Sequence, residues 1–166
     1  MGIRDEEINR LVHYAKGLGI KVSFKDYVPY SRDAGTMTTD NTELDIFVQS
    51  NEPKISIILT LIHELGHAMQ NIYAHDRKPN EELDSALESE EDRKAERKII
   101  YEYELKSSEW WENIYKETNM QFNINKLRLA REFDVWQYEV FYEEGKFPSG
   151  VRRKEKKKAL RRKYAT

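Results

Sequence analysis

Cysteine is absent from this chain of 166 residues, and its absence limits the sites that the chain can build. Without thiols there is no disulfide framework, and the cysteine-rich kind of structural zinc site is excluded. Proteins of reducing compartments do without disulfides, so we expect a cytoplasmic protein.

Long apolar runs are also lacking. No stretch reaches the roughly 20 apolar residues that a membrane span needs, and residues 1–7 are charged where a signal peptide would have its apolar core. We therefore expect a soluble protein with no membrane partner. A hydrophobic content of 39% with ten tyrosines and three tryptophans is sufficient for one folded domain.

The net charge of -2 hides an uneven distribution of charge. Residues 151–166 contain nine of the 28 Lys and Arg residues and one acidic residue, Glu155. The first 150 residues hold the other 19 basic residues and 29 acidic ones. This division predicts a folded domain over 1–150 and a basic C-terminal tail over 151–166.

The spacing of apolar residues predicts an α+β fold. A period of three to four indicates helices and strict alternation indicates strands. Ser107-Ser108 could break the longest helical segment. The expected elements are an N-terminal helix at 4–18, strands at 20–25, 36–39 and 43–49, an apolar helix beginning after 50–53, and helices within 82–116 and 124–144.

The apolar helix carries the motif His63-Glu64-Leu65-Gly66-His67. Histidines four residues apart lie one turn apart on one face of a helix, so both imidazoles can bind one cation. Neutral imidazoles suit Zn²⁺, a catalytic zinc keeps one position open for water, and Glu64 can take that water's proton. A chance match on a core helix and a purely structural metal site are the alternatives.

A catalytic zinc of this kind needs a third protein ligand, commonly a carboxylate from a second helix. We expect Glu96, because it precedes the apolar row of Ile99, Ile100 and Tyr103 at helical spacing. Asp92 is the second choice. All candidates lie 21 to 29 residues beyond His67: Glu88, Glu90, Glu91, Asp92 and Glu96.

Two further histidines lie outside the motif. His13 reads as a surface or packing residue. His75 follows the motif helix and could donate a hydrogen bond to an oxyanion, although a plain surface histidine is the simpler interpretation.

With these residues the chain resembles a zincin metallopeptidase, and specifically the short ImmA/IrrE-type proteins of bacteria and their phages. The resemblance rests on the order of elements over residues 1–110, on the stretch His63 to Ala68, and on a downstream Glu-x-x-small pattern. It implies a minimal zincin-like fold in which His63, His67 and a downstream acid bind zinc and Glu64 is the general base. Family members often act on repressors or other regulators.

We therefore expect a zinc-dependent metallopeptidase that hydrolyses a peptide bond in a protein substrate, with a regulatory protein as the candidate substrate. The strand at 43–49 directly precedes the zinc helix. If it forms the edge of the sheet beside the cleft, it could hold an extended peptide by strand addition.

The rival interpretation is a regulatory or nucleic-acid-associated binding protein with a structural or vestigial zinc site. Its support is the basic segment 152–163, whose cations could weakly neutralise phosphates without regard to sequence. The simpler interpretation of that segment is a solubilising end that lies on the acidic body.

Overall fold

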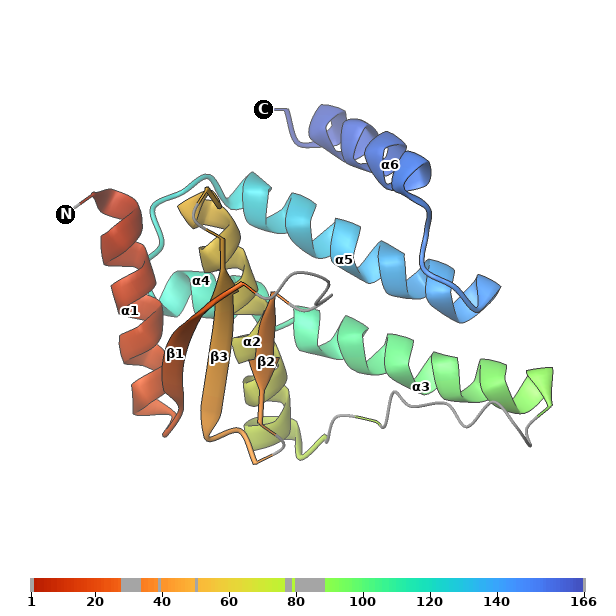
Figure 1. The fold of residues 1–166 in the computed structure, drawn as a ribbon, viewed down its shortest axis with the longest axis horizontal. Coiled ribbons are helices and arrows are strands. Elements are labelled where there is room, and N and C mark those ends of the chain that lie inside the picture. The colour runs from red at the N-terminus through yellow and green to blue at the C-terminus, as the bar shows by residue number, and fades with distance from the viewer. Residues whose placement is uncertain are drawn as a thin grey trace.

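The computed structural model describes residues 2–27, 34–38, 40–49, 51–76, 79 and 89–165. These residues form an α+β fold, as predicted, in which helices pack against one face of a small mixed sheet (Figure 1). The elements in chain order are α1 (Ile3–Gly17), β1 (Lys21–Asp26), β2 (Gly35–Met37), β3 (Glu43–Val48), α2 (Lys54–Ala74), α3 (Glu90–Ser108), α4 (Trp111–Glu117), α5 (Ile124–Glu144) and α6 (Gly150–Lys163).

The three strands are arranged in the order β1-β3-β2. β3 pairs in parallel with β1, with Val22 opposite Leu44, and antiparallel with β2, with Thr36 opposite Asp45. β3 is therefore the central strand and has no free edge, so the expectation that β3 holds a peptide by strand addition is wrong. β2 occupies the edge position on the side that faces the motif residues His63, Glu64 and His67.

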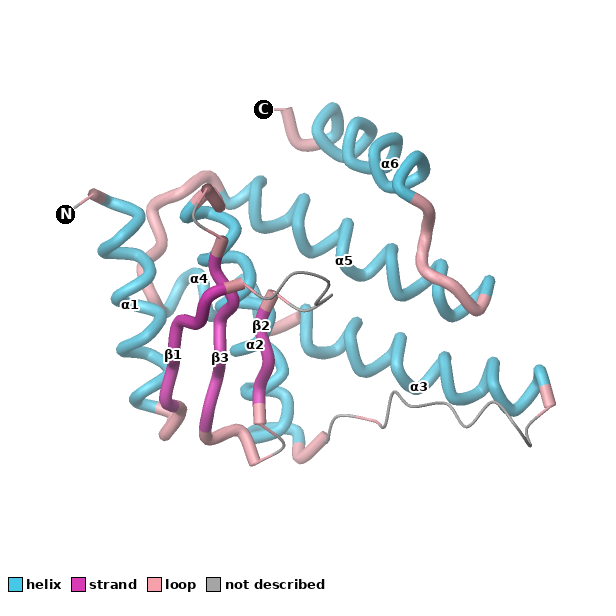
Figure 2. Tube along the Cα trace, viewed as in Figure 1, coloured by secondary structure: helices cyan, strands magenta, loops and turns pink. Residues whose placement is uncertain are grey.

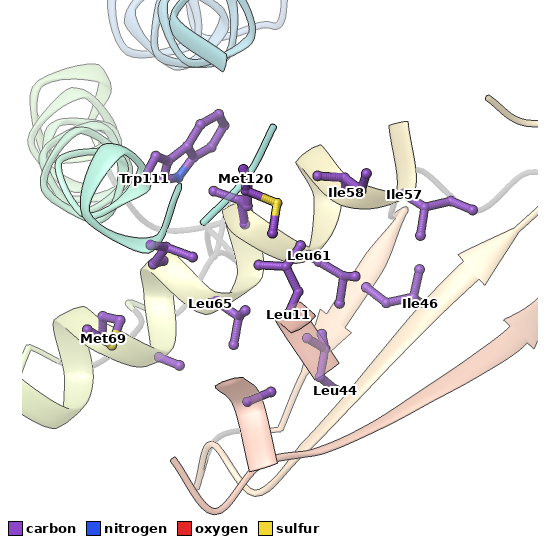
Figure 3. Packing of buried hydrophobic residues seen from close by; sticks show 14 of the residues in the cluster. Leu11, Leu44, Ile46, Ile57, Ile58, Leu61, Leu65, Met69, Trp111 and Met120 are labelled. Carbon is purple, nitrogen blue, oxygen red and sulfur yellow. The ribbon is translucent and has the colours of Figure 1, made fainter. Parts of the chain in front are cut away.

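α2 is the central helix, since α1, α3, α4, β2 and β3 all pack against it. Ile58, Leu61, Ile62 and Leu65 are fully buried, as expected for a helix that is apolar nearly all round. Figure 3 shows Leu61 and Leu65 of α2 together with Leu44 and Ile46 of β3, and Trp111 of α4 close to the same helix. The prediction that the motif lies in a buried helix is confirmed.

The helical half follows the predicted pattern, with a break at the two serines. α3 ends at Ser108 and α4 begins at Trp111, so the chain turns where Ser107-Ser108 suggested. The predicted start of this segment near residue 82 lies outside the described residues. α5 is one continuous helix that runs alongside α3 (Figure 2).

The basic C-terminal segment is also helical. α6 begins at a Ser149 cap, whose hydroxyl accepts a hydrogen bond from the Arg152 amide, and it packs on α5. In the part of the chain that the structure describes, no helix is both long and apolar enough to cross a membrane.

Gly66 lets the corner between α3 and α4 approach α2 closely. A Cβ atom added at Gly66 would lie 2.8 Å from the Ser107 carbonyl oxygen and 3.1 Å from two atoms of the Trp111 indole. A backbone oxygen cannot move aside as a side chain can. The lower helix propensity of glycine is therefore offset by a contact that any side chain would prevent.

We expect Gly66→Ala to lower the free energy of unfolding by about 1–3 kcal/mol, because overpacking against Ser107 outweighs the gain of helix propensity. Urea denaturation followed by circular dichroism measures this change. The matched control is Gly17→Ala at the end of α1, where an added Cβ would meet nothing within 4 Å. An equally stable Gly66→Ala protein would show that the close approach is not needed.

Candidate metal centre

The two motif histidines of α2 point at a common position. Their Nε2 atoms are 3.1 Å apart, and their rings lie edge to face with centroids 4.7 Å apart. This is the arrangement that a spacing of four residues predicts. His67 is the more deeply buried of the two, since 7% of its side chain is exposed against 22% for His63.

Glu104 of α3 completes the cluster. Its Oε2 atom lies 3.3 Å from His67 Nε2 and 4.0 Å from His63 Nε2, and the carboxylate is buried. One ligand atom from each of His63, His67 and Glu104 lies within 4.8 Å of the others. Two imidazoles and one carboxylate therefore converge from two helices.

The expectation that Glu96 supplies the acid is corrected by this geometry. Glu96 precedes Glu104 by eight residues, or about 12 Å along the helix axis, and it does not join the cluster. Glu96 is too far away because α2 crosses α3 near the C-terminal end of α3, where Ser107 lies against Gly66.

The other candidate acids are also placed elsewhere or are not described. Asp92 belongs to the capping box of α3, because its carboxylate accepts a hydrogen bond from the backbone amide of the N-cap residue, Ser89. Glu90 pairs with the buried Arg97 at 2.7 Å, and Glu91 is exposed. Glu88 lies outside the described residues.

A signal for Glu104 was present in the sequence. Glu104-Leu105-Lys106-Ser107 has the Glu-x-x-small pattern, and Glu104 lies four residues after Ile100 on the buried face of α3. The expected acids all lie in the acidic run that ends at Glu96, whereas Glu104 follows that run, 37 residues beyond His67.

Asp134 of α5 extends the cluster behind His63. Its Oδ2 atom lies 3.2 Å from His63 Nδ1, so the carboxylate can fix the ring orientation and leave Nε2 directed at the common position. Sequence reasoning missed Asp134. Its one signal is a carboxylate between Phe133 and Val135 in an otherwise amphipathic helix.

The carboxylates around His63 change its acidity. Burial alone would lower the pKa of His63, but the negative charges of Asp134, Glu64 and Glu104 outweigh burial and raise the pKa to about 10. The electrostatic environment of this imidazole thus favours positive charge.

Aromatic rings support both imidazoles. The Tyr103 ring stacks on His67, with centroids 5.0 Å apart and an angle of 6° between the planes. The Trp111 indole meets His63 edge to face at 5.6 Å. These contacts limit rotation of the imidazoles and exclude water from one side of the cluster.

The cluster opens into a cavity of about 930 Å³. β2 forms one wall through Gly35, Thr36 and Met37, and Tyr103 and Tyr138 contribute from the helical side. Glu64 also lines it, with Oε1 3.9 Å from His63 Nε2. A Cβ at Gly35 would lie 3.1 Å from Glu64 Cγ, so β2 passes directly beside the proposed general base.

The remaining histidines lie apart from this cavity. His75 is exposed and ends α2 in a left-handed conformation with φ 55°, and it is not among the residues that line the cavity. The alternative role of His75 as an oxyanion donor is therefore not supported. His13 is exposed on α1, in agreement with its interpretation as a surface residue.

The cluster fits a zinc ion. Tetrahedral ligands with zinc bonds of 2.0–2.1 Å would be separated by roughly 3.3 Å. The separations from His67 Nε2, 3.1 Å to His63 Nε2 and 3.3 Å to Glu104 Oε2, are close to this value, and His63 Nε2 and Glu104 Oε2 are farther apart, at 4.0 Å. Two imidazoles with one carboxylate are a donor set of catalytic zinc, which leaves the fourth position open toward the cavity. The structure thus contains a cluster that could bind a metal ion, and the binding of zinc is a proposal.

Comparison of the chain with protein-family models, with curated proteins and with solved structures finds no match. The assignment of this centre therefore depends on its own geometry and chemistry.

We expect Glu104→Ala to lose zinc binding and Glu96→Ala to retain it, because Glu104 joins the cluster of the two histidines and Glu96 does not. Metal content of the purified proteins, measured by inductively coupled plasma mass spectrometry after dialysis, distinguishes them. Both substitutions remove one carboxylate from α3, so each is the control for the other. Loss of zinc in Glu96→Ala alone would contradict the assignment of Glu104.

Zinc affinity should also depend on pH. Because the pKa of His63 is raised to about 10, its imidazole is protonated below that pH, and a metal ion has to displace the proton. Apparent affinity should therefore rise by about tenfold per pH unit near neutrality, as linkage to one released proton requires. Competition with a chelator at several pH values measures the slope.

Asp134→Asn supplies the control for this slope, because it removes the nearest charge that raises the pKa of His63. We expect a shallower dependence of affinity on pH in this variant. The same affinity for zinc throughout the neutral range in the wild-type protein would contradict the link to His63.

Proposed function

We propose that this protein is a zinc-dependent metallopeptidase with a minimal zincin-like fold. The observation that carries the proposal is the convergence of His63, His67 and Glu104 beside Glu64 at the wall of one cavity. The resemblance of the motif stretch to ImmA/IrrE-type proteins agrees with it.

Each residue of the cluster has a distinct role in this proposal. His63, His67 and Glu104 hold the zinc ion, and Asp134 orients His63 through Nδ1. When bound, zinc would polarise the scissile carbonyl and acidify a water molecule. Tyr103 and Trp111 keep the imidazoles in place.

Glu64 moves the proton. Its carboxylate faces the same cavity as the ligands, so it can accept a proton from the attacking water and then donate it to the leaving amine. Both transfers need a side chain that is near the reacting atoms and partly desolvated. Glu64 meets these conditions, because 13% of its side chain is exposed.

The substrate would bind as an extended segment along β2. The Phe47 amide donates to the Ala34 carbonyl and the Thr38 amide donates to the Glu43 carbonyl, so Ala34, Thr36 and Thr38 form the hydrogen-bonded pairs with β3. In an antiparallel pair the intervening residues direct their N–H and C=O groups away from the partner strand. Gly35 and Met37 would therefore pair with a peptide in the cavity, and an unfolded or loop segment is the expected substrate.

We expect Glu64→Gln to keep zinc and to lose peptidase activity by at least ~100-fold, because the amide cannot accept a proton. Activity is measured on a library of unstructured peptides, with cleavage products identified by mass spectrometry. Glu91→Gln is the matched control, since Glu91 is exposed on α3. Wild-type rates in a Glu64→Gln protein that binds zinc would exclude the proposed mechanism.

A further inference from the structure

The basic helix α6 lies at the periphery of the molecule. It packs on α5, on the side opposite α3 (Figure 1). Leu160 is its buried residue, with Lys156 and Tyr164 partly buried one turn on either side. These positions, spaced by four residues, define the face of α6 that contacts α5.

The cations on this inner face already have partners in α5. Arg152 forms a salt bridge with Glu144 at 2.7 Å, and Lys163 forms one with Glu132 at 2.6 Å. Lys156 lies over the Trp136 ring at 5.6 Å. A cavity of about 500 Å³ beneath α6 is lined by acidic and basic side chains, so the positive charges that line this cavity have negative charges of the protein beside them.

The other face of α6 carries a second group of cations. At 100° per residue, Lys154, Lys158, Arg161 and Arg162 fall within an arc of about 100° that is opposite Leu160. All four side chains are exposed. They extend over about 12 Å of the helix, and Glu155 at the edge of the arc is the one acidic residue of α6.

We propose that this outer face, defined by Lys154, Lys158, Arg161 and Arg162, binds the phosphate backbone of double-stranded nucleic acid without sequence preference. Four cations on one side of a rigid helix match the closely spaced negative charges of a duplex. The acidic first 150 residues would repel a polyanion, and the peripheral place of α6 keeps the duplex away from them.

The outer face suits a duplex better than the other polyanionic partners. It has no aromatic side chain on which unpaired bases could stack, because Trp136 and Phe133 lie on α5 beneath Lys156 and Lys157. It also lacks the apolar stripe by which an amphipathic helix enters a lipid surface, since Leu160 is buried against α5 and Val151, at the start of α6, is a single exposed apolar side chain.

Fluorescence anisotropy of a labelled 20-base-pair DNA duplex with the full-length protein tests the proposal. Four phosphate contacts predict a slope of about -3.6 for the logarithm of the binding constant against the logarithm of salt concentration. Raising salt from 50 to 200 mM should then weaken binding about 100-fold. Replacing Lys154, Lys158, Arg161 and Arg162 by Gln should remove most of this slope.

The matched control replaces four exposed cations of the body, Lys16, Lys98, Lys116 and Lys126, by Gln, which changes the net charge equally. It should bind the duplex as the wild type does. Circular dichroism and zinc content verify that both variants fold. Equal weakening in the two variants, no duplex binding by the wild type at 50 mM salt, or tighter binding to phosphatidylserine vesicles than to the duplex would each overturn the proposal.

Discussion

The close contact between α2 and the corner that joins α3 to α4 determines the geometry of the metal centre. Gly66 lies between the two histidines in sequence, and the Ser107 carbonyl occupies the space where its side chain would be. Glu104 is one turn before Ser107 on the same helix, so the contact that fixes Ser107 also brings the carboxylate to His67. The packing of Ser107 on Gly66 and the approach of Glu104 to His67 therefore depend on each other. A shift of α3 relative to α2 would separate Glu104 from the two histidines.

Burial of the charges gives this cluster its chemical character. Glu104 and His67 are almost fully buried, and Glu64 and Asp134 lie on either side of His63. Carboxylates in an apolar setting are costly unless a positive charge compensates them. In the metal-free protein, the raised pKa of His63 supplies that charge as a proton. The same electric field would attract a divalent cation, which explains why metal binding and proton release are expected to be coupled.

The sequence predicted the elements better than it predicted how they meet. Local periodicity was sufficient for α1, β1, β3 and the buried α2, and the serines at 107 and 108 predicted the break between α3 and α4. The four-residue spacing of His63 and His67 was sufficient to predict that both imidazoles lie on one face of α2. The choice of acid, however, depends on where a second helix crosses α2. That crossing is set by the contact of Gly66 with Ser107 and Trp111, which are 41 and 45 residues further along the chain. Asp134 was missed for the same reason, since only tertiary packing brings α5 to His63.

Helix α5 separates the metal centre from the basic helix. Asp134 faces His63, whereas Glu132, two residues earlier, faces Lys163 and Tyr164 of α6. Residues two apart in a helix point about 200° from each other, so these two carboxylates act on opposite sides of α5. The negative charge that favours a cation at His63 is thus distinct from the negative charge that holds the inner face of α6. A duplex bound to the outer face of α6 would leave the ligands of the metal centre in place, which allows the two proposed activities to be tested independently.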